Sequence, residues 1–311
     1  PGTLHQLWPV RSRMSPQGHF CRPGSLPATG LRRGLPDFFA VTRLMDLRKS
    51  ARPQKNILLH LCYKGTGFYG WQRQKGMITI QQTVEEAIAA SGLGQVSLIG
   101  CGRTDAGAHA LNYLANFYTD RALPVPQIKN AINAHLPQSI RVLKVSRVPP
   151  SFHSRYLTVS KIYRYLIADR YSPFLESTAW VITRPLDISK MKAAAAFLTG
   201  KHDFASFQSA GSKIKSTVRE IRRIQLRRSR FTLDPAVKIL TIEIESTGFL
   251  YKMARNIVGL LVRVGQDKLP VAEVPGILSA RDRRQAPPPA PAAGLYLKKV
   301  KYERMRPGSP D

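Results

Sequence analysis

The sequence is poor in cysteine and has no metal-binding pattern. Its 311 residues include three cysteines, Cys21, Cys62 and Cys101. Because no two of them form a Cys-x-x-Cys pair, we expect no structural disulfide and favour a reducing compartment. The seven histidines, among them His109 and His153, show no metal-ligand spacing, so we expect no metal site.

Long apolar runs and acidic residues are also scarce. No stretch approaches the roughly 18 apolar residues that would cross a bilayer, so we expect a soluble protein with no membrane partner. The 19 Asp and Glu face 48 Lys and Arg, which gives a formal charge of +29. Such a chain repels itself unless a polyanion neutralises it, and nucleic acid is the first candidate partner. A basic surface that serves solubility alone is the alternative.

The N-terminal stretch of the chain carries proline and glycine repeatedly and shows no sustained helical or strand period. We expect residues 1–52 to be a disordered or non-native extension in front of the fold. An organelle transit peptide over residues 1–44 is the competing interpretation, because this stretch is rich in arginine and poor in acids. We favour a start at Met45 over Met14 and a cytoplasmic location. Residues 304–311 are expected to form a short tail.

The stretch richest in reactive groups is the loop over residues 100–110. Its three glycines in eight residues allow a close approach to a ligand. Three consecutive residues supply a cation, a hydroxyl and a carboxylate, namely Arg103, Thr104 and Asp105. A turn closed by the aspartate is the alternative, and the local residues do not decide between the two. We interpret Cys101 as a small buried thiol, because no group is evident that would activate it as a nucleophile.

Hydrophobic periodicity predicts the β-α-β-β-α-β order of a split βαβ fold, repeated in a second half. In the first half, strands are expected near residues 56–63, 96–99, 113–118 and 140–145, with one helix after a capping box of Thr79 and Gln82 and another over 126–135. In the second half, strands are expected over 161–167, 217–231 and 238–246, with helices over 187–198 and about 250–264. The chain is long enough for two domains.

Three further features leave alternatives open. Residues 64–74 interleave glycines, aromatics and cations, as a surface that stacks on bases does, but a glycine-rich turn is as good an explanation. Arg255 lies at the margin of an apolar helix face near the helix N-terminus, which favours either an anionic partner or snorkelling to solvent. The strand over 217–231 fits a solvated edge as well as phosphate contact, and its arginines are Arg219, Arg222, Arg223, Arg227, Arg228 and Arg230.

Five motifs taken together resemble the tRNA pseudouridine synthase A family, in family order over residues 56–302. The catalytic loop of that family is similar to residues 102–110, where Ala108 replaces the usual valine and changes packing but no reacting group. The other resemblances are a first loop at 64–72, a central tyrosine segment at 152–155 and 161–165, an arginine helix at 248–259, and a C-terminal signature at 290–295.

The resemblance implies isomerisation of uridine to pseudouridine at positions 38–40 of the tRNA anticodon arm, without a cofactor. It assigns Asp105 as the nucleophile, which attacks either sugar or base, and Arg255 as the cation that keeps it ionised. Tyr163 is expected to stack on the flipped uracil and serve in proton transfer, and Arg103 to fill the vacated space. Substrate contacts are expected at Tyr63, Gly67, Phe68, Gln72, His109, Lys161 and Leu295.

The implied fold class is α+β: two ferredoxin-like halves, over residues 53–152 and 153–303, with antiparallel sheets joined side by side around a central cleft. The resemblance also implies a homodimer that shares each tRNA. The rival hypothesis is a non-catalytic tRNA- or RNA-binding chaperone on the same scaffold, which we expect to have lost the aspartate, tyrosine or arginine. A hydrolase that uses Asp105 covalently is disfavoured, because no second carboxylate or metal cluster is near it.

Overall fold

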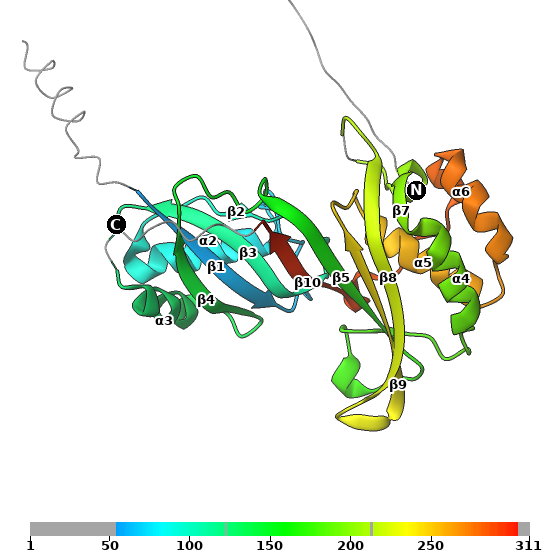
Figure 1. Cartoon of the computed structure of the whole chain (residues 1–311). Coiled ribbons are helices and arrows are strands. Elements are labelled where there is room, and N and C mark those ends of the chain that lie inside the picture. The colour runs from blue at the N-terminus through cyan, green and yellow to red at the C-terminus, as the bar shows by residue number, and fades with distance from the viewer. Residues whose placement is uncertain (1–53, 122, 212–213, 304–311) are drawn as a thin grey trace, which may run out of the picture. The chain divides into compact units, whose positions relative to one another are not determined.

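The computed structural model describes residues 54–121, 123–211 and 214–303, which lie in one compact unit (Figure 1). The predicted N-terminal extension and the predicted tail lie outside the described residues. None of the helices in the described part of the chain is long and apolar enough to cross a membrane.

The first half has the predicted order of elements. These are β1 (Lys55–Tyr63), α2 (Ile80–Ile88), β2 (Ile99–Gly100), β3 (His109–Thr119), α3 (Val125–His135) and β4 (Ile140–Val148). β1 lies between β4 and β3 and is antiparallel to both, and β2 pairs with the other edge of β3. This is the strand order of a split βαβ fold, so the prediction for this half is confirmed.

Helix α2 begins at its predicted cap, but the capping box is only half formed. The Thr79 hydroxyl accepts a hydrogen bond from the backbone N–H of Gln82 at 3.4 Å. The Gln82 side chain does not return to Thr79 and donates instead to Glu86 at 2.8 Å. A carboxylate one turn ahead attracts this amide, because a bond to a charged acceptor is stronger than one within the box.

The second half repeats the pattern with additions. Its elements are β5 (Thr158–Ala168), β6 (Trp180–Val181), α4 (Ile188–Leu198), β7 (Gly200–Asp203), β8 (Val218–Phe231), β9 (Asp234–Ser246), α5 (Met253–Gly265), α6 (Val274–Ala280) and β10 (Leu295–Tyr302). β5 lies between β10 and β9, and β8 flanks β9. β6, β7 and α6 were not predicted, since each is too short to show a period.

Strand β10 joins the two halves into one sheet (Figure 1). It runs antiparallel to β5 along most of its length. It runs parallel to β3 over only two residue pairs, Tyr296 with His109 and Leu297 with Ala110. The described chain is therefore α+β, with two antiparallel sheets side by side, as predicted. The boundary between residues 152 and 153 stays a prediction, because one sheet continues through both halves.

Helix α5 begins later than its apolar pattern predicts. Leu250 is buried but lies in the turn before the helix. Lys252 precedes the first helical residue with a left-handed backbone (φ 58°), which breaks the helical path. Arg255 consequently lies in the first turn of α5, where its backbone is fixed by the start of the helix.

Candidate active site

An ion pair joins the loop of the first half to helix α5 of the second. Arg255 Nη1 donates to Asp105 Oδ2 at 2.7 Å, and the two side chains are only 13% and 15% exposed. Arg255 Nε donates to the carbonyl of Ala290 at 2.7 Å, and the Ala290 N–H returns a bond to the Arg255 carbonyl at 3.0 Å. Because guanidinium is a planar fork, two fixed acceptors determine its orientation.

Tyr163 belongs to the same junction. It lies on β5, is 9% exposed, and meets the ring of Phe249 edge-on at 4.7 Å. Burial raises the pKa of the Tyr163 phenol, and the nearby Cys101 and Asp105 raise that pKa further. Among the described residues, its hydroxyl has no hydrogen-bond partner. At neutral pH this residue is therefore an uncharged phenol that can donate or accept a hydrogen bond.

The first loop packs backbone to backbone against the predicted catalytic loop. The N–H of Trp71 donates to the Thr104 carbonyl, and the N–H of Gly107 donates to the Phe68 carbonyl, each at 3.2 Å. A Cβ at Gly65 would lie 1.9 Å from the Ala108 carbonyl oxygen. Only glycine allows so close an approach, so the glycines of residues 64–74 serve at least the packing of the two loops.

His109 connects four segments at the base of the predicted catalytic loop. Its Nδ1 accepts from the Gly65 N–H at 3.0 Å, while Nε2 lies 3.0 Å from the Ser177 carbonyl and 2.9 Å from that of Ala293. The ring also stacks on Tyr296 at 4.7 Å. These contacts assign a neutral imidazole with its proton on Nε2. Burial lowers the pKa of His109, which agrees with that form.

The other predicted substrate residues divide into an exposed and a buried group. The Arg103 side chain is exposed, and its Nε donates to Gln72 Oε1 at 3.4 Å. Lys161 Nζ lies against Gly102, and burial lowers the pKa of this ammonium. Gly67 is exposed with φ +83°, and Phe68 is half-buried.

Two buried side chains complete this set. Tyr63 is buried, and its hydroxyl lies 2.9 Å from that of Thr104. Leu295 is buried where β10 begins. Cys101 is fully buried, and burial raises the pKa of its thiol, as expected for a packed and unactivated cysteine.

A comparison with known families decides the class of the chain. The family model described as tRNA pseudouridine synthase matches residues 61–157 and 194–303. The two matched ranges contain the predicted catalytic loop, its arginine partner and the C-terminal signature. The chain belongs to the tRNA pseudouridine synthase family.

Curated relatives agree with this membership. The chain is 40% identical over 250 residues to "tRNA pseudouridine synthase A" of Thermoanaerobacter sp., which covers 80% of this chain and 100% of the relative. It is also 40% identical to the protein of that name from Acetivibrio thermocellus, with the same coverage. Two solved structures also match. The match to a Galdieria sulphuraria protein has a TM-score of 0.19 and 10% identity, and covers 69% of this chain and 93% of that one. The match to a Cbf5-Nop10-Gar1 complex has a TM-score of 0.26 and 11% identity, and covers 67% and 54%.

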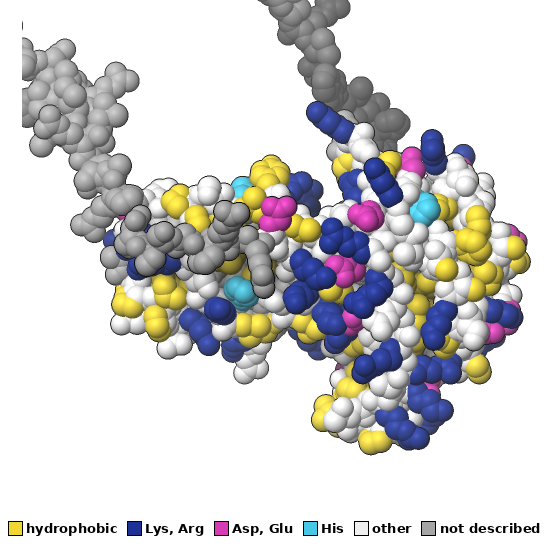
Figure 2. Space-filling view, viewed as in Figure 1, with side chains coloured by type: hydrophobic (Ala, Val, Ile, Leu, Met, Phe, Trp, Pro, Cys, Tyr) yellow, Lys and Arg dark blue, Asp and Glu magenta, His cyan; other side chains and the backbone are white. Residues whose placement is uncertain are grey.

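The basic strand of this pseudouridine synthase family member forms much of the exposed edge of the sheet. β7 covers β8 only at residues 218–221, so the rest of β8 is a free edge bearing charge, one of the two predicted alternatives. Among the described residues, none of the six β8 arginines is in an ion pair. Figure 2 shows Lys and Arg side chains following β8 and β9 along this face. Phosphate contact, the second predicted alternative, requires this free charge as well.

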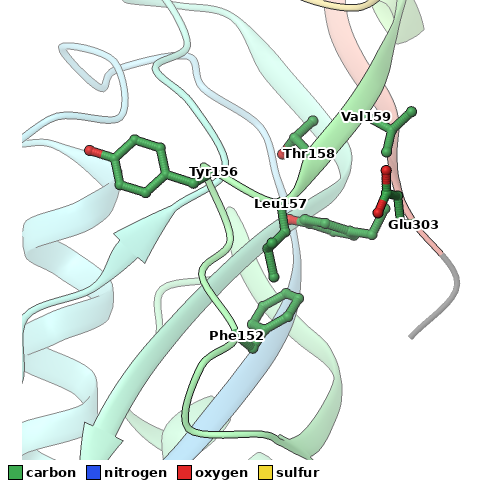
Figure 3. Close-up of a pocket in the computed structure, with 7 residues that line it drawn as sticks. Phe152, Tyr156, Leu157, Thr158, Val159 and Glu303 are labelled. Carbon is green, nitrogen blue, oxygen red and sulfur yellow. The ribbon is translucent and has the colours of Figure 1, made fainter. Parts of the chain in front are cut away.

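A surface pocket lies apart from the Asp105–Arg255 pair. It is formed between residues 152–159 and the end of β10, and it is lined by Phe152, Tyr156, Leu157, Thr158, Val159, Tyr302 and Glu303 (Figure 3). None of the predicted catalytic residues lines it. In the described part of the chain, no group of three or more His, Cys, Asp or Glu is arranged to hold a metal ion.

Sequence reasoning missed some of the groups that build this site. The Ala290 carbonyl was unforeseeable, because a backbone acceptor leaves no trace in side-chain chemistry. Gln81 and Glu85 are recognisable from the sequence, because they are one helical turn apart. They also share the buried side of α2 with Val84 and Ile88. Polar residues at such positions need partners.

Proposed function

We propose that this chain isomerises uridine to pseudouridine at positions 38–40 of the anticodon arm of tRNA. The glycosidic C–N bond breaks, the uracil turns, and a C–C bond to the sugar forms. A proton leaves the ring carbon that forms this bond, and the released nitrogen gains one, so the reaction needs no oxidant and no cofactor. The observation that carries the proposal is the ion pair of Asp105 with Arg255 in a family member.

Asp105 is the proposed nucleophile. An aspartate attacks only as the carboxylate, and in a mostly buried setting a cation must stabilise that form. The 2.7 Å contact with Arg255 supports this assignment. Because Arg255 takes Oδ2, and Oδ1 has no hydrogen bond among the described residues, one oxygen remains to face the substrate.

Tyr163 and Arg103 are proposed to handle the extruded base. The neutral phenol of Tyr163 would stack on the uracil and exchange a proton through a hydrogen bond, since its raised pKa makes it a poor general base. The exposed Arg103 would occupy the space that the uridine leaves in the stem, which offsets part of the cost of unstacking.

The remaining predicted contacts are proposed in two roles. Exposed or half-buried residues would touch the RNA directly, and these are Gly67, Phe68, Gln72 and Lys161. Buried residues would act by fixing the loops, and these are Tyr63, His109 and Leu295. The division follows from exposure, because Tyr63, His109 and Leu295 keep at most 5% of their surface exposed, less than the 9% of Tyr163.

Pseudouridine mapping of tRNA tests the proposal directly. We expect modification at one or more of positions 38–40 after incubation with the wild-type protein, and none with Asp105→Ala, while tRNA binding is retained by both. A wild-type protein that binds tRNA and modifies no uridine would favour the non-catalytic RNA chaperone. Modification by Asp105→Ala would reject the nucleophile while leaving the enzyme class intact.

A homodimer that shares one tRNA and a cytoplasmic location are also part of the proposal. The homodimer comes from the family resemblance, and the location from the scarcity of cysteine and the favoured start at Met45. Sedimentation of the full chain with and without tRNA tests the first: a monomer mass at concentrations that support activity would reject it. Imaging of the full chain in its native cell tests the second, and concentration in an organelle would favour the transit-peptide interpretation of residues 1–44.

A further inference from the structure

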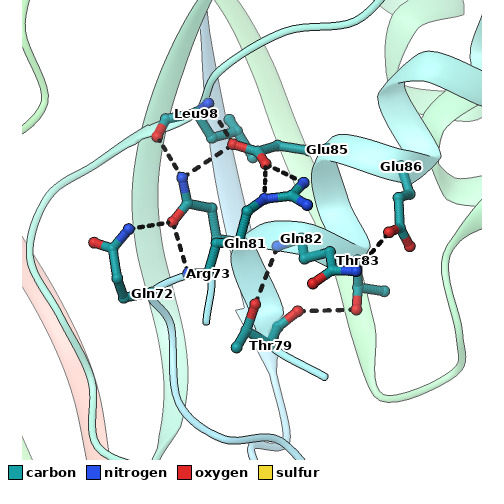
Figure 4. Close-up of polar contacts among 9 residues, drawn as sticks. All are labelled: Gln72, Arg73, Thr79, Gln81, Gln82, Thr83, Glu85, Glu86 and Leu98. Carbon is teal, nitrogen blue, oxygen red and sulfur yellow. Dashed lines mark hydrogen bonds and ion pairs between the residues drawn. The ribbon is translucent and has the colours of Figure 1, made fainter. Parts of the chain in front are cut away.

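Helix α2 carries a buried polar pair that no role has yet been given. Gln81 and Glu85 are each only 8% exposed and are one turn apart, and Gln81 Nε2 donates to Glu85 Oε1 at 3.0 Å. Two buried polar side chains on an otherwise apolar face weaken the packing of a helix unless their partners compensate. Figure 4 shows that these partners come from two chain segments, residues 72–73 and Leu98, next to the buried face of α2.

One set of partners is the end of the first loop. Gln81 Oε1 accepts from Gln72 Nε2 at 3.0 Å and from the backbone N–H of Arg73 at 3.1 Å. Glu85 Oε2 accepts from two nitrogens of the Arg73 guanidinium, at 3.1 Å and 2.6 Å. The pair therefore fixes both the backbone and the side chains of residues 72–73.

The other partner is the chain that leads into the catalytic loop. The N–H of Leu98 donates to Glu85 Oε1 at 2.9 Å, and the carbonyl of Leu98 accepts from Gln81 Nε2 at 3.3 Å. Leu98 immediately precedes β2. One buried pair thus holds the two segments that carry Gln72 and Arg103.

The direction of every bond follows from the charge of Glu85. An ionised carboxylate only accepts hydrogen bonds, so the amide nitrogen of Gln81 must face it and the amide oxygen must face Gln72. That oxygen takes the amide nitrogen of Gln72, which leaves Gln72 Oε1 directed to Arg103 Nε at 3.4 Å. The buried Glu85 therefore orients the exposed Arg103 through three hydrogen bonds in series, by way of Gln81 and Gln72.

We propose that Gln81 and Glu85 are positioning residues that hold Arg103 beside Gln72, ready to enter the stem as the target uridine leaves. The proposal rests on the proposed function. A free arginine side chain samples many rotamers, and restricting it in advance lowers the entropy lost when it inserts. Two neutral amides, the buried Gln81 and the exposed Gln72, perform that restriction, and the charge of Glu85 stays inside, paired with Arg73.

The test uses Gln81→Leu, which keeps the size of the side chain and removes both hydrogen-bonding ends. The matched control is Gln82→Ala, the next residue on α2, whose side chain hydrogen-bonds to Glu86 alone among the described residues. We expect Gln81→Leu to lower the single-turnover rate on tRNA about tenfold to a hundredfold with unchanged tRNA affinity. The control should retain the wild-type rate.

Two further measurements separate positioning from mere packing. In a double-mutant cycle, Gln81→Leu should cost nothing more once Arg103→Ala is present. On an anticodon arm whose target uridine is unpaired, the loss caused by Gln81→Leu should shrink to within about twofold. Equal losses on paired and unpaired targets, or additive losses with Arg103→Ala, would reject the proposal.

A second variant covers a failure of Gln81→Leu to fold. Gln72→Leu breaks the relay at an exposed position. Because it also removes a proposed RNA contact, its rate loss should be at least as large, and the unpaired target should rescue the part that comes from the relay. A Gln72→Leu protein with the wild-type rate would overturn the relay. Absence of pseudouridine with the wild-type protein would be a failure of the proposed function itself, and this inference would fall with it.

Discussion

Arginines in two regions of this molecule have opposite surroundings. Arg255 is mostly buried, and both ends of its guanidinium meet fixed acceptors, Asp105 and the Ala290 carbonyl. The β8 arginines lie along a sheet edge, and none is in an ion pair within the described residues. The first arrangement stores its counter-charge inside the protein. The second leaves its charge available to an anion from outside.

The difference indicates two electrostatic roles for arginine in this protein. A paired, desolvated cation acts strongly at short range and controls one carboxylate. Unpaired surface cations act together at longer range, and salt screens them. We therefore expect changes at the junction to alter chemistry, and changes on β8 to alter affinity and its salt dependence.

Removing the charge of Asp105 breaks the junction most completely. Asp105→Asn keeps the shape of the side chain, and we expect the single-turnover rate to fall at least about a thousandfold, because an amide is no nucleophile. The tRNA dissociation constant should change less than about threefold. A rate within tenfold of wild type, measured by release of tritium from labelled uridine, would exclude a nucleophilic role for this residue.

Arg255→Lys separates charge from geometry. A lysine keeps the charge but lacks the planar fork, so it cannot hold Asp105 and the Ala290 carbonyl together. We expect a rate loss of about a hundredfold and a loss of unfolding free energy of about 2 kcal/mol, below the 3–5 kcal/mol of a fully buried pair. Rapid quench and denaturant unfolding measure the two effects.

The control for this variant is Arg164→Lys. Arg164 pairs with Glu243 at 2.8 Å on β5 and β9, and Lys298 also contacts that glutamate. A rate loss from Arg164→Lys as large as that from Arg255→Lys would mean that any disturbed ion pair slows the enzyme. A specific role of the Asp105–Arg255 pair in the chemistry would then be excluded.

The fold was largely predictable because both halves repeat one strong pattern. Strands such as β1 and helices such as α4 show their own period, and the sequence locates them within a few residues. The elements that were missed, among them β7, have too few residues for a period. The late start of α5 was also invisible, since the left-handed turn at Lys252 interrupts an apolar stripe that continues unbroken in the sequence.

The site was predictable only through its motifs. Local chemistry left Asp105 undecided between a reactive carboxylate and a turn residue, and gave Arg255 two alternative environments. The contact between them joins residues 150 positions apart, a distance that no periodicity can bridge. The backbone acceptors and the relay from Glu85 depend on the same tertiary packing, so they emerge only from the folded chain.

Neutralising the sheet edge should weaken binding and spare chemistry. We choose Arg222, Arg223 and Arg227, which are exposed and whose guanidinium groups donate no hydrogen bond among the described residues. Their combined replacement by glutamine should weaken tRNA binding about tenfold or more at low salt. Each lost phosphate contact should reduce the slope of log K against log salt by about 0.7 to 0.9. The rate at saturating tRNA should not change.

A control with the same loss of charge sharpens this experiment. Lys129, Lys192 and Lys268 are exposed and belong to α3, α4 and the turn after α5, not to β8 itself, so replacing them by glutamine lowers the net charge equally. If this variant loses as much tRNA affinity as the β8 variant, the attraction depends on the net charge of the protein. β8 would then be a solvated edge strand without specific phosphate contacts.

Lowering the pH should weaken the contacts of His109 beside the Asp105 loop while the β8 arginines keep their charge. We expect this to be the smallest of the effects. His109 is held neutral, with a pKa lowered from its ordinary value of about 6.5. The unfolded chain therefore binds more protons than the folded one as pH falls below 6.5, and stability decreases there. Above 6.5 this contribution is fully present. Lys64, on the first loop, adds repulsion in the same direction.

Replacing the imidazole should flatten that decrease. In His109→Gln the side chain still offers an acceptor and a donor but cannot titrate, so the free energy of unfolding should fall less between pH 6.5 and 5 than in wild type. Some dependence should persist, because burial also lowers the pKa of His60. Urea unfolding at several pH values measures the slopes. Identical slopes in the two proteins would mean that His109 gains its proton as readily in the folded chain as in the unfolded one. The assignment of a neutral His109 imidazole in the folded protein would then be wrong.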